Sequence, residues 1–217
     1  MVTRVLGWLA VLALVAGLVA GFGVAPREVT QGNVQRIMYL HVPAAIVGEY
    51  LAFGVLLLAS IAYLVSRSTQ ADRLAHASAE VGVLFLAVTI TSGSLWGKPT
   101  WGTWWTWDAR LTTVTVLFVM GLGYLLLRAT IDDEERAARF AAVLGIIAPL
   151  NVPLVHFSVY WWRTLHQPPS LLKPGPATMS SPILVALLIN LAAFALLYAY
   201  LVTARARLLR RQAEVLI

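Results

Sequence analysis

Long apolar stretches alternate with short polar ones along the whole chain. Charged side chains are absent or nearly absent from six stretches: 5–25, 42–65, 81–96, 111–127, 140–162 and 183–204. A helix needs about 20 apolar residues to cross a bilayer, so each stretch predicts one membrane-spanning helix. We expect an all-α fold, a single six-span membrane domain over residues 1–217, with spans at about 5–25, 43–65, 79–96, 111–128, 140–160 and 183–204.

The composition narrows the class of protein. Apolar residues make up 59% of the 217 residues and charged residues only 12%, about half the charged share of a soluble domain. This excludes a soluble enzyme, a nucleic-acid-binding domain and a secreted disulfide scaffold, so we expect membrane lipid and no nucleic acid as a partner. The chain has no cysteine, which leaves histidine as the obvious strong metal ligand.

The distribution of positive charge predicts the topology. With six spans, both termini lie on one side of the membrane. Of the 16 Lys and Arg residues, ten fall on that side and six on the other. Cytoplasmic loops carry the excess of Lys and Arg, so we expect both termini in the cytoplasm. Three segments then lie on the periplasmic side: 26–41, 97–110 and 163–182.

Most tryptophans lie in or beside these periplasmic segments. Of eight tryptophans, five fall within twelve residues and two more open the third segment: Trp96, Trp101, Trp104, Trp105, Trp107, Trp161 and Trp162. One interpretation is an aromatic belt at the membrane surface. A belt should appear on both sides, however, and only Trp8 lies near the other side. Clustered indoles offer flat stacking surfaces, so we favour the binding of a large flat ligand.

Two histidines lie at the edges of the same segments. His41 ends the stretch 33–41, whose apolar spacing predicts a short amphipathic helix on the membrane surface, and Pro43 suits the first turn of the next span. His166 follows Trp162 by four residues, so both are predicted on one helical face. Two imidazoles beside tryptophans are typical of axial ligands to haem iron, and we predict His41 and His166 as those ligands.

Charged residues near these histidines have candidate roles in haem binding. Periplasmic cations suit the two haem propionates, because such ion pairs are strong and directional; they are Lys98, Arg110 and Arg163, with Arg36 less favoured. Asp108 is predicted to cap the fourth span, and it is also placed to orient Arg110 or an imidazole.

Three titratable residues lie elsewhere. Glu49 falls about two turns into the second span, and we expect it to face the bundle interior or the site, because an unpaired carboxylate in a membrane is costly. His156 lies inside the fifth span, and the sequence leaves open whether it supports the site or bonds to a neighbouring helix. His76 is expected in a solvated cytoplasmic loop, without a role.

Residues 96–113 (WGKPTWGTWWTWDARLTT) closely resemble the tryptophan-rich signature of the WWD family of haem-handling proteins. Residues 36–45 (RIMYLHVPAA) and 156–167 (HFSVYWWRTLHQ) are similar to further segments of that family, whereas 167–170 (QPPS) depart from its pattern. The resemblance implies that His41 and His166 ligate the haem. It also implies that the WWD loop, residues 97–110, holds the haem through Trp101, Gly102, Trp105, Trp107 and Asp108.

The resemblance also implies a function and partners. The similarity is greatest to the branch of the family that serves bacterial cytochrome c maturation. There, haem b is held at the periplasmic face of the inner membrane and loaded covalently onto a small membrane-anchored haem chaperone (CcmE). An ABC transporter of the CcmA and CcmB subunits, with the small subunit CcmD, releases the loaded chaperone. The chain has no GxxxxGK[ST] phosphate loop, so another subunit would hydrolyse ATP, and whether this protein is itself an enzyme is left open.

Three other functions agree with parts of the sequence. A cytochrome c synthase also carries a WWD loop, but such proteins have more spans and a large outer domain. A respiratory subunit holding b-type haem predicts histidine pairs inside facing helices near the middle of the bilayer. A haem transporter predicts inverted repeats or broken helices, and although Pro149 and Pro153 interrupt the fifth span, no second half mirrors them.

Overall fold

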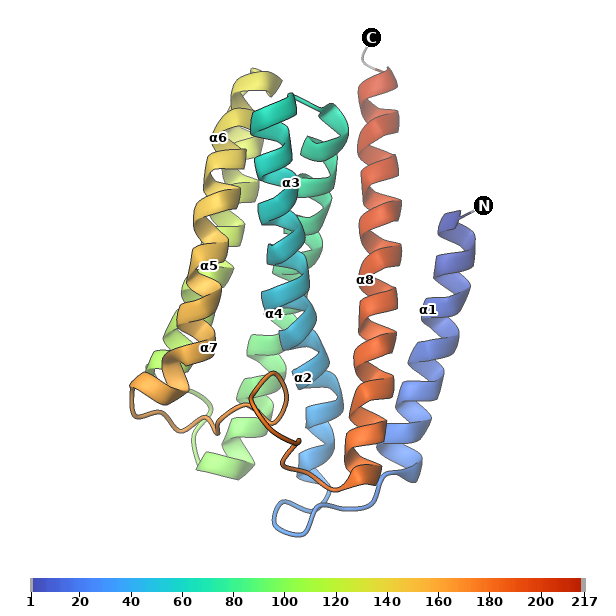
Figure 1. Cartoon of the computed structure of the whole chain (residues 1–217), viewed down its shortest axis with the longest axis vertical. Helices are drawn as coiled ribbons and strands as arrows, with labels where there is room; N and C mark the ends of the chain where they lie inside the picture. The colour runs from blue at the N-terminus through green and yellow to red at the C-terminus, as the bar shows by residue number, and fades with distance from the viewer. Residues whose placement is uncertain (1, 216–217) are drawn as a thin grey trace.

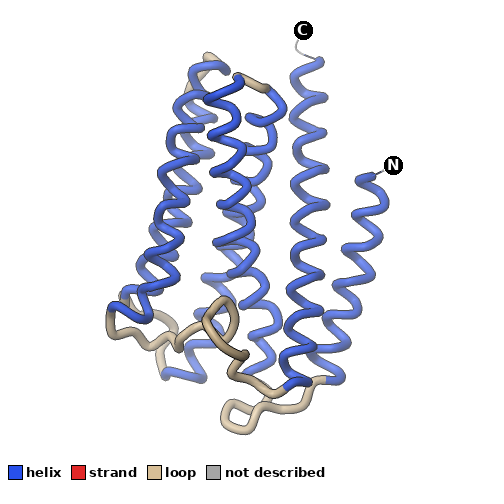
Figure 2. Tube along the Cα trace, viewed as in Figure 1, coloured by secondary structure: helices blue, strands red, loops and turns tan. Residues whose placement is uncertain are grey.

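The computed structural model describes residues 2–215, most of which lie in helices (Figures 1 and 2). Its elements are α1 (Val2–Leu18), η1 (Val19–Val24), η2 (Val34–Ile37), α2 (Met38–Ala45), η3 (Ile46–Ala52), α3 (Phe53–Ser66), α4 (Thr69–Trp101), α5 (Ala109–Thr130), α6 (Glu134–Ile147), η4 (Ala148–Leu150), α7 (Asn151–Trp161) and α8 (Ser181–Val215). Taken end to end, they form six helices long and apolar enough to cross a membrane. The predicted all-α, six-helix membrane fold is therefore confirmed, with residues 1, 216 and 217 of the predicted domain lying outside the described residues.

Polar side chains fix where three of the helices begin. Ser68, Asp108 and Asp133 each accept a hydrogen bond from the backbone N–H three residues later, at the starts of α4, α5 and α6. Such caps satisfy N–H groups that have no partner inside the helix. The predicted cap at Asp108 is confirmed, and its side-chain oxygen lies 2.9 Å from the Leu111 nitrogen.

The third span is longer than the apolar stretch that predicts it. Because α4 begins at Thr69, His76 lies on a helix, with its Nε2 3.4 Å from Glu80. The expectation of a solvated loop at His76 is wrong, since Ser68 starts the helix well before the apolar residues begin. At its other end α4 continues to Trp101, so only residues 102–108 of the predicted WWD loop lie outside helices.

The second span also begins earlier than predicted. Residues 33–41 do not form a separate helix on the membrane surface, because η2, α2, η3 and α3 run on as one helix, Val34–Ser66. Pro43 lies in the interior of α2 and not in its first turn, where it removes one backbone donor. Met38 and Tyr39 are buried in the core beside α8 residues. The continuous helix therefore holds His41 on a rigid element.

The helices form a bundle with a paired flank (Figure 1). α3, α4, α5 and α6 pack around a core that includes Phe53, Leu56 and Leu117, all fully buried. α1 packs on α8, and α8 packs on α2 and α4. The three long connections, which precede η2, α5 and α8, gather at the end away from both termini (Figures 1 and 2). The segments predicted to carry the chemistry therefore lie together.

Charged pairs join the helices at the opposite end. Arg128 on α5 makes two hydrogen bonds to Asp72 on α4, at 2.5 and 2.9 Å. Arg205 on α8 pairs with Glu80 on α4 in the same two-pronged way, a geometry that is strong and directional. These pairs tie α5 and α8 to α4 far from the tryptophan-rich loop.

Candidate functional site

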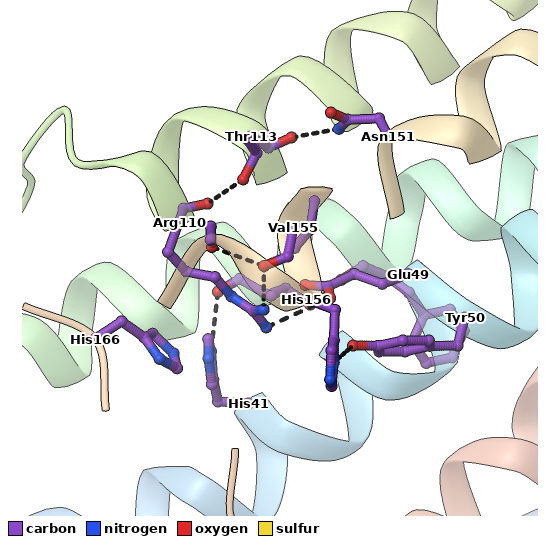
Figure 3. A network of polar contacts seen from close by, with 12 residues as sticks. His41, Glu49, Tyr50, Arg110, Thr113, Asn151, Val155, His156 and His166 are labelled. Carbon is purple, nitrogen blue, oxygen red and sulfur yellow. Dashed lines mark hydrogen bonds and ion pairs between the residues drawn. The ribbon is translucent and has the colours of Figure 1, made fainter. Parts of the chain in front are cut away.

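His41 and His166 face the same cavities at the loop end of the bundle. Both line a cavity of about 100 Å³ and a smaller neighbour of about 50 Å³. Figure 3 shows their imidazoles beside each other, His41 from α2 and His166 from the loop that follows α7. The structure therefore brings together the two histidines that the sequence selects, although they are 125 positions apart in the chain.

Contacts with α4 orient the imidazole of His41. Its Nδ1 lies 3.1 Å from the Thr89 carbonyl oxygen and 3.1 Å from Ser92 Oγ. An Nδ1–H donated to the carbonyl leaves the Nε2 lone pair as the one that can bind a metal, which is the usual arrangement of a ligating histidine. The ring also lies against Gly93, where an added Cβ would come within 2.9 Å of His41 Cε1. Only glycine allows α4 to approach this closely.

Local hydrogen bonds also orient the imidazole of His166, again with Nδ1 at a backbone carbonyl oxygen. Its Nδ1 lies 2.8 Å from the Gln167 carbonyl oxygen, and its backbone N–H donates to Thr164 Oγ1. The ring packs against Trp101, with 6.1 Å between ring centroids. Burial, together with the nearby positive charge of Arg110, lowers the pKa of His166 to about 4. The imidazole is therefore neutral at neutral pH, as a metal ligand must be.

Trp162 does not share a helical face with His166, so that prediction is wrong. Helix α7 ends at Trp161, and Trp162 has an extended backbone, with φ −128° and ψ 159°. Its side chain is exposed and packs edge-on against Trp161, with 5.7 Å between centroids. The chain leaves the helix about two turns before the prolines at 168 and 169, and His166 reaches the cavity from a loop.

A buried ion pair lies next to the two histidines (Figure 3). Glu49 is 1% exposed, and its Oε2 lies 3.5 Å from Arg110 Nη2. Arg110 also donates to the Val155 carbonyl oxygen at 2.7 Å. Both residues line both cavities. The structure thus places Glu49 at the site, but it turns Arg110 inward, away from the exposed position expected of a propionate partner.

The tryptophans divide into an inner and an outer set. Trp101 and Trp105 line the smaller cavity, and Trp96 lines the larger one and meets His41 edge-on at 5.8 Å. Trp104 and Trp107 are 54% and 74% exposed. The density of indoles in the sequence did not separate the two sets, because the loop between α4 and α5 follows no regular period.

Two cations and a glycine shape the outer side of this loop. Lys98 is exposed, donates to the Gly102 carbonyl oxygen at 3.1 Å, and lies 6.0 Å from the ring centroid of Trp104. Gly102 ends α4 with φ +80°, a conformation that favours glycine. Arg163 is exposed at the start of the next loop. These cations, unlike Arg110, lie at the surface.

Asp108 links the two loops through its two carboxylate oxygens. One oxygen caps α5, and the other accepts a hydrogen bond from the Leu165 backbone N–H at 3.0 Å. The second contact fixes the residue before His166. The sequence predicted a cap at Asp108 and an orienting role toward Arg110 or an imidazole. The hydrogen bond to the Leu165 backbone could not be predicted, because no local pattern indicates a contact with a loop 57 positions away.

Known proteins are similar to this chain over most of its length. The family model for heme exporter protein C (CcmC) matches residues 1–216. The heme exporter protein C of Bradyrhizobium diazoefficiens is 44% identical over 214 residues, covering 96% of this chain and 81% of the relative. That of Haemophilus influenzae is 40% identical over 203 residues, covering 93% and 81%. A putative cytochrome c biosynthesis ccmC-like mitochondrial protein of Marchantia polymorpha is 40% identical over 152 residues, covering 70% and 64%.

The chain belongs to the heme exporter protein C family. Membership accounts for the whole length of the six-helix domain, and it confirms the expected link to haem handling in c-type cytochrome maturation. Sequence reasoning missed the groups that orient His41. The signal was present in α4, where Thr89, Ser92 and Gly93 follow the i, i+3, i+4 spacing of one helix face.

Proposed function

We propose that this protein binds haem b at the periplasmic face of the bacterial inner membrane and promotes its covalent transfer to the membrane-anchored chaperone CcmE. The observation that carries the proposal is the pair His41 and His166, each with Nδ1 at a carbonyl oxygen and both facing one cavity beside tryptophans. When bound, haem supplies an iron that takes two such imidazoles and vinyl groups to which the chaperone attaches.

The residues at the site fit haem in chemistry. Imidazoles suit the iron, and the inner tryptophans suit the flat ring. The chain has no cysteine to form the thioether bonds of a c-type haem, which fits the proposed haem b. The cavity of about 100 Å³ is smaller than the roughly 300–1,000 Å³ of ligand sites. We therefore expect the loop 163–180, which carries His166, to move outward when haem enters.

Exposed groups around the cavity suit the propionates and the partners. Lys98 and Arg163 are surface cations that suit carboxylates, while Arg110 would reach a propionate only by leaving Glu49. Trp104 and Trp107 present apolar area that suits contact with CcmE. We expect CcmA, CcmB and CcmD to release the loaded chaperone. The respiratory alternative is disfavoured, because His166 lies in a loop and not on a helix facing His41.

The purified protein tests the proposal directly. With haem b added, its absorption spectrum should show a Soret band of bis-imidazole haem. With CcmE present, a haem stain on a denaturing gel should show haem attached covalently to CcmE. A protein that takes up no haem, or that leaves CcmE unloaded, would contradict the proposal.

Replacing Asp108 with Asn should weaken haem binding by loosening the His166 loop. The amide keeps one oxygen to cap α5, but its NH₂ group cannot accept a hydrogen bond from the Leu165 N–H. We expect haem affinity to fall by about 10–100-fold, the range for losing a residue that orients a metal ligand. Asp133→Asn is the matched control, because Asp133 caps α6 at the other end of the bundle. Equal affinities of both variants and the parent, measured by haem titration, would exclude this role.

Reporter fusions test the proposed topology. A reporter that is active only in the periplasm should be inactive when fused after Ile217, which lies outside the described residues, and active when inserted between Gly102 and Thr103. The last turns of α8 and the loop between α4 and α5 lie at opposite ends of the bundle (Figure 1), so the two fusions should give opposite signals. The reverse pattern would place the histidines on the cytoplasmic side and remove the proposed function.

A further inference from the structure

The larger cavity continues from the two histidines toward the middle of the membrane. Besides His41 and His166 it is lined by Tyr50 and His156. Tyr50 follows His41 by nine residues on one continuous helix, which places it about 13 Å farther along the axis at about 1.5 Å per residue. The cavity therefore extends from the loop end into the part of the bundle formed by membrane-spanning helices.

A wide helical turn aims polar groups into this deeper part. Residues 46–52 form the π-helix η3, and π segments are rare and frequent at functional sites. Two neighbouring residues of η3 both reach across the cavity: Glu49 to Arg110 on α5, and Tyr50 to His156 on α7 (Figure 3). The distance from the Tyr50 hydroxyl oxygen to His156 Nδ1 is 2.7 Å.

His156 lies between the cavity and an aromatic face of α7. Its ring meets Phe157 edge-on at 4.9 Å and lies 6.3 Å from Tyr160, while Phe157 stacks on Trp161 at 5.2 Å. Phe157, Tyr160 and Trp161 are 42%, 51% and 57% exposed. On a membrane-spanning helix, this exposed aromatic surface faces lipid in the leaflet next to the loop end.

Helix α7 packs less extensively on its neighbours than α6 does, so side chains close the larger cavity between α7 and the second span. The first half of the fifth span, α6, packs on both α3 and α5, whereas α7 packs on α5. Tyr50 of the second span and His156 and Val159 of α7 are among the residues that line the larger cavity. Rearranging these side chains would open the cavity to lipid, and would leave the helix packing around α5 in place.

We propose that His156, with Tyr50, is a second haem-binding position, where haem arriving from the lipid is held before it passes to His41 and His166. This inference rests on the proposed function. A histidine in a membrane span is energetically costly, and such residues often mark functional sites. The aromatic face of α7 suits a flat apolar ring. An Nδ1–H donated to the Tyr50 oxygen would leave Nε2 for the iron, as at the other two histidines.

Haem uptake from a bilayer tests the route. The apo-protein is placed in lipid nanodiscs, haem b is supplied in the lipid, and the Soret band is followed over time. His156→Ala and Tyr50→Phe should slow uptake severalfold, yet reach the final spectrum of the parent, because His41 and His166 are intact. His76→Ala, at the opposite end, should match the parent. An unchanged uptake rate in His156→Ala would overturn the inference, and the parent-like final spectrum shows that the variant is folded.

Removing the outer ligands tests the position itself. The double variant His41→Ala/His166→Ala should retain a minority of haem with one histidine ligand, and adding His156→Ala should remove it. If the double and triple variants carry the same haem, His156 is no binding position. If the parent itself takes up no haem, the proposed function fails. If the parent takes up haem and His156→Ala takes it up at the same rate, only the inference about His156 fails.

Discussion

Replacing His41 or His166 with alanine should abolish the bis-imidazole Soret band of the purified protein and stop loading of CcmE. Each substitution removes one proposed iron ligand, and among the described residues the only other histidine that lines either cavity is His156, within the fifth span. We expect a loss of affinity larger than the roughly 10–100-fold caused by losing an orienting group. The measurement is a haem titration followed by absorption, with the gel assay for CcmE.

Added imidazole should distinguish the two positions. His166 comes from a loop at the mouth of the cavity, so free imidazole should restore part of the spectrum in His166→Ala. His41 is enclosed by α4 through Thr89, Ser92 and Gly93, so rescue of His41→Ala should be weaker. His76→Ala should bind haem like the parent. Two single variants with parental spectra and parental loading would show that these histidines are not the ligands.

Removing the inner tryptophans should impair transfer more than ligation. Trp101→Ala/Trp105→Ala takes away the indoles that line the smaller cavity. Aromatic contacts contribute roughly 0.5–1.5 kcal/mol each beyond the buried area, so two of them amount to about 1–3 kcal/mol, or up to about 100-fold in affinity. His41 and His166 should still give a bis-imidazole spectrum, while covalent loading of CcmE should fall sharply because the ring is no longer held in place.

Trp104→Ala/Trp107→Ala is the matched control for the inner pair. It removes two indoles from the same loop, but both are exposed, so haem affinity should stay near the parental value. The resemblance groups Trp107 with Trp101 and Trp105, whereas in the structure Trp107 is exposed and lines neither cavity. If the inner and outer pairs reduce haem affinity equally, the loop acts as an interfacial anchor, and the belt interpretation is preferred.

The six helices were predictable because each contains an apolar stretch of the length that a bilayer requires. Their ends were not, because hydropathy does not register polar turns. α4 starts at Thr69 because the Ser68 side chain caps it there. The second span starts at Val34, although Pro43 suggested a later beginning. These errors placed His76 in a loop and His41 on a separate surface helix.

At the site, it was easier to predict which residues take part than where their side chains point. His41 and His166 could be paired from their position beside tryptophans, and Asp108 from its place before an apolar stretch. The inward turn of Arg110 depends on Glu49, which lies on another helix, 61 positions away. Likewise, the hydrogen bond of Tyr50 to His156 spans 106 positions. Such pairings arise from helix packing, and no local pattern in the chain encodes them.

We expect helix α8 to set the depth at which the proposed haem site lies in the membrane. Its 35 residues span about 52 Å at about 1.5 Å per residue, well beyond a hydrocarbon layer of about 30 Å. The excess lies at the end with exposed Arg207, Arg210 and Arg211, beyond the pairing of Arg205 with Glu80. Arginines prefer the headgroup layer, so they fix the immersion depth from the far side. In a thicker or thinner bilayer, the resulting hydrophobic mismatch would act at the opposite end of the bundle, where we propose that haem binds.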